Sequence, residues 1–435
     1  MKKPTNAAEA LSHVRSGDAV YIHSNAACPK VLVSALTERA GAGDLKDITI
    51  FQIITLGDAP YAAPQFKDTF TVQNLFIGPN TRLAVNEARA HYVPIFFSDL
   101  AWMFESGNAR ADVVLLHCSP PDADGNLTLG LSLDCTLAAL KNARLVIAEI
   151  NPRMPRTHGQ TKIHIDQIHH IVETEYELCE LPNHPPGEDE LAIGRRVADL
   201  VEDGATLQMG IGEIPNAVLL ALRGKKNLGV HSEMFSDGVV NLVEAGVIDN
   251  SRKTLVPGKS VVSFSMGTRR LYDFLDDNDD VAFMPVDFVN DPFNIAKNYR
   301  MTAINSALQI DLTGQVCADS IGTSMYSGCG GQVDFVRGSW RSEGGKSIMA
   351  LPSTAKGGQI SRIVPTLKAG AGVVTSRFDV HWVVTEYGTV NLRGMNMSQR
   401  VKALISIAAP QFQEELERQA AETFPWLDHR VSVKV

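Results

Sequence analysis

The sequence predicts an α/β protein with mostly parallel sheets, divided into two structurally similar domains. Short apolar, strand-like runs alternate with helix-like patterns along the chain, and the helix-like Leu137–Ala143 followed by the strand-like Leu145–Ile147 is a typical stretch. This alternation is characteristic of α/β proteins, in which helices cover the faces of the sheet. A unit of strand, loop and helix also occurs twice, and this repetition predicts the two domains.

The repeated unit is a strand, a loop of small residues and a helix that starts near a proline. Its first copy runs from the strand Gly17–His23 to the helix Pro29–Leu36, and its second from the strand Gly204–Met209 to the helix Pro215–Leu222. Each proline is expected in the first turn of its helix, where the missing N–H leaves no hydrogen bond unmade. Because such units are common in α/β proteins, chance similarity stays open as the alternative.

A connector between the two domains is expected at Glu180–Glu188. This segment holds three prolines and one glycine, which disfavour helix and strand and are typical of an exposed link. We therefore expect an N-terminal α/β domain over residues 1–185 and a C-terminal α/β domain over residues 186–435.

Composition and charge exclude several classes of protein. Of the 435 residues, 44% are hydrophobic and 20% are charged, as in globular rather than disordered proteins. The 40 Lys and Arg against 49 Asp and Glu give a net charge of −9, which argues against nonspecific binding to nucleic acid or to an anionic membrane. Apolar runs such as Ala111–Cys118 are well short of the roughly 18 residues that a membrane span needs.

The N-terminal residues and the cysteines indicate a cytoplasmic protein. No apolar h-region follows Met1–Pro4, so no signal peptide is expected. The six cysteines are scattered without a Cys-x-x-Cys pair, a pattern that indicates reduced thiols. The twelve histidines show no His-Glu-x-x-His spacing, and we expect no metal site.

A glycine loop stands between the second repeated strand and its helix. It consists of Gly210, Ile211, Gly212, Glu213 and Ile214. Glycines let backbone N–H groups approach an anionic or carbonyl ligand closely, and the dipole of the following helix favours an anion there. The third glycine of the dinucleotide fingerprint is missing, and a plain tight turn is the alternative.

Glu233 lies in the segment His231–Gly238, at or just past an expected strand end, with Asp237-Gly238 as a turn signal. Open α/β sheets place their ligands at such strand ends. A solvated loop glutamate is the alternative.

Two further segments combine glycines with reactive or basic side chains. Gly328, Gly330 and Gly331 surround Cys329, and such a loop can aim N–H groups at a developing oxyanion. No histidine lies close to Cys329 in the sequence, which argues against a catalytic thiol. Lys356, followed by two glycines, is suited to a phosphate or a pantetheine carbonyl, and an exposed loop lysine is the alternative.

Taken together, these segments resemble the acetyl-CoA hydrolase/transferase family of class I CoA-transferases, and within it the 4-hydroxybutyrate and butyrate CoA-transferases. The motifs that carry the resemblance are spread over most of the chain: Gly78–Arg82, Val85–Glu87, Ser119–Gly125, Asn151–Gly159, Gly210–Asn216, His231–Gly238, Gly330–Phe335, Glu386–Gly388 and Asn391–Gly394. Several long motifs in one order make the match more specific than any single glycine pair.

The resemblance implies two similar open α/β domains of the CoA-transferase type, with the active site in the cleft between them. It implies that Glu233, in the C-terminal domain, is the catalytic glutamate, and that Asn290 positions the acyl carbonyl or carboxylate. The residues implied to contact coenzyme A are Gly210, Ile211, Gly212, Glu213, Ile214, Gly330, Gly331 and Lys356.

For Glu233 the resemblance implies covalent, ping-pong catalysis. A glutamate with an ordinary pKa of about 4.3 is ionised at neutral pH, and its carboxylate would attack an acyl-CoA thioester to form an acyl-glutamyl anhydride and CoA thiolate. The thiolate would attack the glutamyl carbonyl, release the first acid and leave a glutamyl-CoA thioester. An incoming carboxylate would then reverse both steps.

The expected function is CoA transfer from acetyl-CoA to 4-hydroxybutyrate or butyrate, by a homodimer or dimer of dimers. Coenzyme A is expected as a substrate, with no tightly bound cofactor. Two alternatives stay open. One is an acyl-CoA hydrolase, in which water takes the second half-reaction. The other is a non-catalytic sensor of acyl-CoA or a sugar phosphate, for which the sequence offers no basic helix-turn-helix segment.

Overall fold

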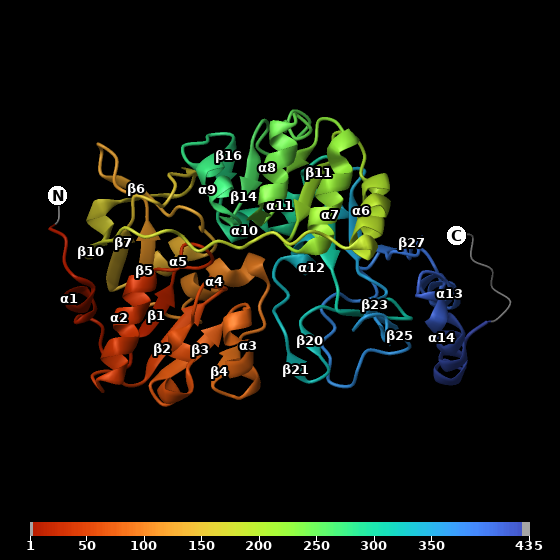
Figure 1. Cartoon of the computed structure of the whole chain (residues 1–435), viewed down its shortest axis with the longest axis horizontal. Coiled ribbons are helices and arrows are strands. Elements are labelled where there is room, and N and C mark those ends of the chain that lie inside the picture. The colour runs from red at the N-terminus through yellow and green to blue at the C-terminus, as the bar shows by residue number, and fades with distance from the viewer. Residues whose placement is uncertain (1–2, 429–435) are drawn as a thin grey trace. The chain divides into compact units, whose positions relative to one another are not determined.

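The computed structural model describes residues 3–428, which form two compact units (Figure 1). Unit 1 comprises the residues up to Asn183 together with Ser232–Asp237 and Lys259–Asp291. Unit 2 comprises His184–His231, Gly238–Gly258 and the residues from Pro292 onward. The chain first passes from unit 1 to unit 2 within the expected connector Glu180–Glu188.

The units differ from the expected domains in one respect that matters for the site. Glu233 and Asn290 were expected in the C-terminal domain, but both belong to unit 1. The reason is strand pairing: β16 (Val281–Phe283), from the second half of the chain, pairs with β8 (His158–Gly159), from the first half. Sequence order therefore does not decide which unit holds these residues.

Unit 1 is built on a seven-stranded sheet in which every neighbouring pair is parallel. In spatial order the strands are β10 (His170–Glu173), β7 (Leu145–Ile150), β5 (Val113–Cys118), β1 (Ala19–Ile22), β2 (Ile48–Gln52), β3 (Phe70–Asn74) and β4 (Ala90–Tyr92). The chain starts at β1, moves outward to β4, and returns to β5 on the other side of β1. The gap between β1 and β5 is thus the topological switch point, where open α/β sheets place their ligands.

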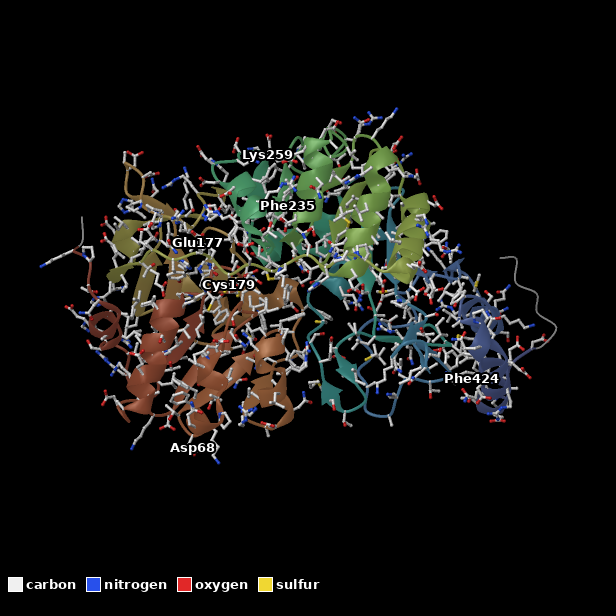
Figure 2. The ribbon with its side chains drawn as sticks, in the orientation of Figure 1. Asp68, Glu177, Cys179, Phe235, Lys259 and Phe424 are labelled. Atoms are coloured by element: carbon white, nitrogen blue, oxygen red, sulfur yellow. The ribbon has the colours of Figure 1, made fainter. Side chains whose placement is uncertain are left out.

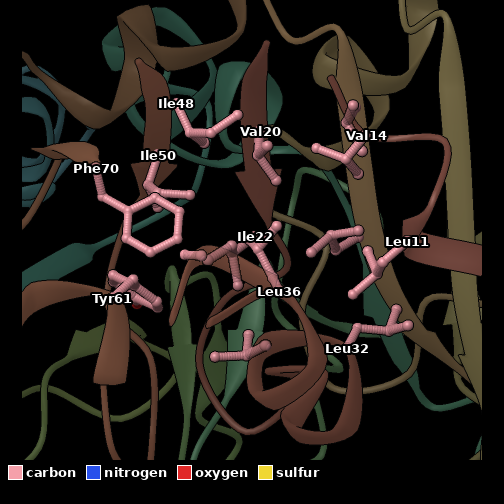
Figure 3. Close-up of a cluster of buried hydrophobic side chains, with 14 of the residues drawn as sticks. Leu11, Val14, Val20, Ile22, Leu32, Leu36, Ile48, Ile50, Tyr61 and Phe70 are labelled. Carbon is pink, nitrogen blue, oxygen red and sulfur yellow. The ribbon is translucent and has the colours of Figure 1, made fainter. Parts of the chain in front are cut away.

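The helices of unit 1 are α1 (Ala7–Leu11), α2 (Lys30–Gly41), α3 (Pro79–Asn86), α4 (Leu100–Glu105), α5 (Thr136–Lys141), α9 (Arg269–Leu275) and α10 (Val286–Val289). Strand β1 shows how they cover both faces of the sheet. Val20 and Ile22 belong to the buried cluster that includes α1 and α2 (Figure 3). Tyr21 points to the other face, where its ring meets Phe104 of α4 edge-on at 5.6 Å and its hydroxyl lies 3.1 Å from Thr136 Oγ1 of α5.

Smaller sheets complete unit 1. They are β14 (Ser260–Val262), β16 and β8 in one sheet, the parallel pair β13 (Met234–Phe235) and β15 (Phe264–Ser265), and the antiparallel pair β6 (Asn126–Thr128) and β9 (Lys162–His164). The β13–β15 pair incorporates the residues next to Glu233 into unit 1.

Unit 2 is built on a six-stranded sheet that is parallel except at its last strand. In spatial order the strands are β12 (Gly229–Val230), β11 (Thr206–Met209), β17 (Met301–Ser306), β22 (Lys346–Ala350), β26 (Trp382–Val384) and β27 (Thr389–Asn391). Its helices are α6 (Glu188–Leu200), α7 (Glu213–Ala221), α8 (Asp237–Glu244), α11 (Pro292–Ala296), α12 (Gln332–Ser339), α13 (Met397–Ser406) and α14 (Pro410–Thr423). Its minor strands are β18 (Gln309–Asp311), β19 (Val316–Cys317), β20 (Ser320–Ile321), β21 (Ser324–Met325), β23 (Thr354–Ala355), β24 (Ile360–Ser361) and β25 (Ile363–Val364).

The two repeated units of the sequence are the β1–α2 and β11–α7 segments, one in each unit. Pro215 lies in the first turn of α7, as expected, whereas Pro29 is the N-cap of α2, one residue before the helix. The Asp237-Gly238 pair, expected as a turn, opens α8 instead. The Asp237 carboxylate accepts a hydrogen bond from the backbone N–H of Thr268 at 3.0 Å. Among residues 3–428, no helix has the length and apolarity required to cross a membrane.

Candidate active site

Glu233 lies in a bend between β12 and β13, and backbone bonds hold it there. Its carbonyl oxygen accepts hydrogen bonds from the N–H groups of Ser263 and Phe264, both at 2.9 Å. Two residues further on, the buried ring of Phe235 (Figure 2) stacks on Phe274 with ring centres 6.1 Å apart. The backbone of Glu233 is therefore fixed, while its side chain is only half-buried.

Asn290 meets Glu233 through its side chain. It caps the C-terminus of α10, where its N–H donates to Val286 O at 2.8 Å. Its side chain is 0% exposed, and Nδ2 donates to Glu233 Oε2 at 2.9 Å. A hydrogen bond from a neutral amide to a carboxylate is strong and directional. It orients the Glu233 carboxylate without adding a counter-ion, so the structure brings the two residues predicted as catalytic into contact.

The predicted glycine loop at 210–214 occupies the end of β11 in unit 2. Gly212 is the N-cap of α7 with φ +112°, a conformation that favours glycine. The space beside Gly210 and Gly212 is open, since a Cβ added to either glycine would meet no atom within 4 Å, and Ile211 is 44% exposed. The N–H groups at the start of this nine-residue helix are suited to an anionic or carbonyl ligand.

The second glycine loop precedes α12 in the same unit. Gly331 is the N-cap of α12, and Gly330 has φ +54°. From the first residue of the helix, Gln332 Nε2 donates to the carbonyl of Ser306 at 2.8 Å. Ser306 ends β17, and β17 is the parallel neighbour of β11. Both glycine loops therefore lie at the carboxyl ends of adjacent strands, although they are more than 100 residues apart in the sequence.

Lys356 occupies the turn of the antiparallel β23–β24 hairpin in unit 2. Its side chain is exposed and its backbone has φ +52°. Cys329, in the second glycine loop, is half-buried, and all six cysteines are thiols in the structure. The predicted residues thus form two groups: Glu233 and Asn290 in unit 1, and the two glycine loops and Lys356 in unit 2.

A buried polar cluster in unit 1 was not predicted from the sequence. We call it the β1-end cluster; its members are His23, Ser24, Asn25, Ser132 and Asp134, none more than 1% exposed. The first three follow β1, at the carboxyl end that faces the switch point. The sequence signal was the strict alternation of Leu127, Leu129, Leu131 and Leu133 with Thr128, Gly130, Ser132 and Asp134, which resembles a half-exposed strand but is buried on both sides.

No group of three or more His, Cys, Asp or Glu side chains in the described part of the chain is arranged to hold a metal ion.

Comparison with known proteins identifies the family. Residues 1–179 match the N-terminal domain of the acetyl-CoA hydrolase/transferase family, and residues 267–420 match its C-terminal domain. A 4-hydroxybutyrate coenzyme A transferase from Clostridium kluyveri is 47% identical over 97% of this chain and 98% of its own. A succinyl-CoA:acetate/propanoyl-CoA:succinate CoA transferase from Fasciola hepatica is also 47% identical, over 96% and 88%.

The fold is similarly shared. The crystal structure of RipA from Yersinia pestis is 36% identical and superposes with a TM-score of 0.92, covering 97% of both chains. By contrast, an acetyl-CoA hydrolase from Neurospora crassa is 26% identical over 77% of this chain and 71% of its own. The chain belongs to the acetyl-CoA hydrolase/transferase family and groups with its CoA-transferases.

Proposed function

We propose that this chain moves CoA from an acyl-CoA, with acetyl-CoA as the donor, to a short-chain carboxylate such as 4-hydroxybutyrate or butyrate, with Glu233 as the nucleophile. The observation that carries the proposal is the 2.9 Å hydrogen bond from the buried Asn290 amide to the Glu233 carboxylate. It presents an oriented carboxylate in a chain whose relatives are named as CoA transferases.

In the first half-reaction, a Glu233 oxygen attacks the thioester carbonyl carbon, and the resulting oxyanion collapses with loss of CoA thiolate. The products are an acyl-glutamyl anhydride and the free thiolate. The thiolate then attacks the glutamyl carbonyl carbon of the anhydride, the bond to the acyl carboxylate breaks, and the first acid leaves. Glu233 is now a glutamyl-CoA thioester. Every bond that forms in these two substitutions is matched by one that breaks, and no oxidation state changes.

In the second half-reaction, the acceptor carboxylate attacks the glutamyl-CoA thioester and expels the thiolate. The thiolate attacks the acyl side of the new anhydride, which forms the new acyl-CoA and regenerates the Glu233 carboxylate. In each half-reaction one attack is on the glutamyl carbonyl and places negative charge on the oxygen of Glu233, whose carboxylate accepts a hydrogen bond from the Asn290 amide. Loss of one such preorganised donor lowers kcat by about 10²–10³-fold in other enzymes, so Asn290 has a role in both half-reactions.

Coenzyme A is a polyanion, while the whole chain carries −9. We propose that the glycine loops at 210–214 and 330–331 receive it through backbone N–H groups, and that Lys356 supplies a local positive charge. Both loops lie at carboxyl ends of the unit 2 sheet, and the open space beside Gly210 supports close approach of a ligand.

The acceptor acid is the least constrained part of the proposal. One methylene changes binding by only about 1–3 kcal/mol, and the two relatives at 47% identity are named for different acids. A panel of carboxylates with acetyl-CoA, read by mass spectrometry for new acyl-CoAs, identifies the acceptor. 4-Hydroxybutyrate and butyrate are expected to give the highest kcat/KM.

The nucleophile is tested with Glu233→Gln, which keeps the size of the side chain but removes its charge. We expect at least about a thousandfold loss of transfer, because no other group replaces a covalent nucleophile. With the wild-type enzyme and acetyl-CoA, hydroxylamine should trap a modification at residue 233, and Glu38→Gln, on the exposed surface of α2, should behave as wild type.

Full activity of Glu233→Gln, or no trapped species at residue 233, would show that the proposed mechanism is wrong. Loss of acetyl-CoA that is not stimulated by added carboxylate would identify a hydrolase instead. Binding of acyl-CoA without either reaction would identify a sensor. The cytoplasmic location and the dimeric or tetrameric state remain predictions.

A further inference from the structure

We infer that Asp134 is a positioning residue for CoA transfer, because its carboxyl group ties the loop after β1 to the backbone that carries Glu233 and Asn290. The inference deepens the proposed function and rests on it. Asp134 acts through its neighbours rather than on the reacting atoms.

The first step is the local network of Asp134. Its Oδ2 atom accepts hydrogen bonds from the hydroxyls of Ser24 and Ser132 and from Asn25 Nδ2, the last at 3.1 Å. The donors also contact one another: Asn25 Nδ2 lies 2.9 Å from Ser132 Oγ, and the Ser24 and Ser132 hydroxyls are 3.0 Å apart. One buried oxygen therefore fixes three side chains from two segments that are more than 100 residues apart in sequence.

The second step links this network to the backbone of Glu233. Ser132 forms an antiparallel bridge with Phe264, flanked by hydrogen bonds from Leu133 N to Ser263 O at 2.9 Å and from Ser265 N to Leu131 O at 2.8 Å. The N–H groups of Ser263 and Phe264 in turn donate to the Glu233 carbonyl. A displacement of Ser132 would therefore displace Glu233, because Ser263 and Phe264 are hydrogen-bonded to both segments.

The third step links the same residue to Asn290. The carbonyl of Asp134 accepts from Val286 N at 3.1 Å, at the start of α10. That four-residue helix ends at Val289, and its C-cap residue Asn290 donates to the Glu233 carboxylate. Asp134 is therefore connected to both residues of the proposed catalytic pair: to Glu233 through residues 263–265, and to Asn290 through α10.

The backbone conformations of Asp134 and Asn25 also support a positioning role. Asp134 and Asn25 have φ of +40° and +56°, in the left-handed region that non-glycine residues keep only where the surroundings enforce it. Here the enforcing contact is the hydrogen bond between these two side chains. Strained residues of this kind concentrate at functional sites.

The charge of Asp134 is not the essential property. All three donors are neutral, and burial raises the pKa of its carboxyl group to about 6. Oδ2 accepts all three bonds, whereas Oδ1 has no hydrogen-bond partner in the described residues. An asparagine whose carbonyl oxygen takes the place of Oδ2 would keep the network, and an alanine would remove it.

The test compares Asp134→Ala and Asp134→Asn with a matched control, Asp112→Ala. Asp112 is also buried in unit 1, and its Oδ2 atom accepts a hydrogen bond from Ala19 N at 3.0 Å. It precedes β5, at the opposite, amino edge of the same sheet. For each folded variant, kcat, the KM for acetyl-CoA, the single-turnover rate of glutamyl-CoA thioester formation and the thermal midpoint are measured.

We expect Asp134→Ala to lower kcat and the rate of thioester formation about 30-fold or more, since a displacement of about 1 Å in a catalytic group can slow a reaction about 10²-fold. The KM for acetyl-CoA should change less than about threefold, because the groups that bind it are untouched. Asp134→Asn should recover most of the lost rate, and Asp112→Ala should lower the thermal midpoint without lowering kcat.

Three results would overturn the inference: an Asp134→Ala variant with wild-type kcat, an equal loss of kcat in Asp112→Ala, or no recovery in Asp134→Asn. If Asp134→Ala does not fold, Ser132→Ala, which leaves the Phe264 bridge in place, is measured in the same way and must still lower kcat. The wild-type enzyme is assayed first: if it forms no thioester at Glu233, the proposed function fails, and this is distinct from a failure of the positioning role.

Discussion

At the scale of single residues, burial of acidic groups in unit 1 is a source of pH dependence. Glu149, on β7, is fully buried, and its two oxygens accept hydrogen bonds from Leu32 N at 2.7 Å and from the Tyr176 hydroxyl at 2.5 Å. Burial raises the pKa of Glu149 from its ordinary 4.5 to about 7, in spite of these bonds. The native state therefore holds the Glu149 proton more tightly than the unfolded chain does.

A stability change with a definite sign follows from this shift. Glu149 contributes fully at low pH, and its contribution is lost as pH rises from about 4.5 through about 7, because the unfolded chain ionises first. Relative to Glu149→Gln, the wild-type free energy of unfolding should fall by about 2 kcal/mol between pH 5 and pH 7.5. Urea unfolding of both proteins at the two pH values measures this, and a difference that is constant or rises with pH would contradict the assignment.

Single residues also show how much of the candidate site could be predicted from the sequence. Glu233 and Asn290 were both predicted as catalytic from motifs that resemble a family, and their side chains form a hydrogen bond in the structure. Asp134 was not identified, because an aspartate in an apolar alternating stretch has no distinctive local pattern. Its significance lies in Ser24 and Asn25, which are brought to it only by the pairing of distant segments.

At the scale of elements, the position of the first glycine loop depends on the packing of α7 against α6. Gly194, in the middle of α6, lies so close to α7 that an added Cβ would stand 2.6 Å from the carbonyl carbon of Ala217. This close approach sets the axis of α7, whose first turn carries Glu213 and Ile214 of the loop. The position of α7, which carries part of the glycine loop, therefore depends on Gly194 of α6.

Gly194→Ala should therefore destabilise the protein, although alanine is the better helix former by about 1 kcal/mol. The overlap with the α7 backbone costs about 1–3 kcal/mol, and we expect a net loss of about 1 kcal/mol or more in the free energy of unfolding. Gly41→Ala is the matched control, because Gly41 is the exposed last residue of α2 with its nearest neighbour at 4.0 Å. A stabilised Gly194→Ala, measured by chemical unfolding, would refute the packing argument.

At the scale of the whole molecule, each unit is more than a continuous stretch of sequence. Unit 1 includes Ser232–Asp237 and Lys259–Asp291, which follow the connector in the chain. The pairing of β16 with β8 and the bridge between Phe264 and Ser132 join these segments to the first half. Covalent continuity at the connector is therefore not what holds unit 1 together.

Cleavage of the connector tests this organisation. A protease site inserted at His184–Gly187 should be cut while the two fragments stay associated, because the second fragment supplies strands of unit 1. The nicked protein should elute as one species in native buffer on size exclusion, and as two species in concentrated guanidinium chloride. Separation of the fragments in native buffer would show that the returning segments do not hold unit 1.

The sequence by itself determined the α/β class with parallel sheets, the strand–loop–helix units and the family, because these depend on local periodicity, on proline and glycine, and on motifs along the chain. Tertiary structure alone decided that Glu233 and Asn290 belong to unit 1, that the two glycine loops end adjacent strands, and that Asp134 gathers Ser24, Asn25 and Ser132. The physical reason is that strand pairing and buried hydrogen bonds join residues far apart in the sequence, and no local pattern of residue types records which distant partner satisfies a buried group.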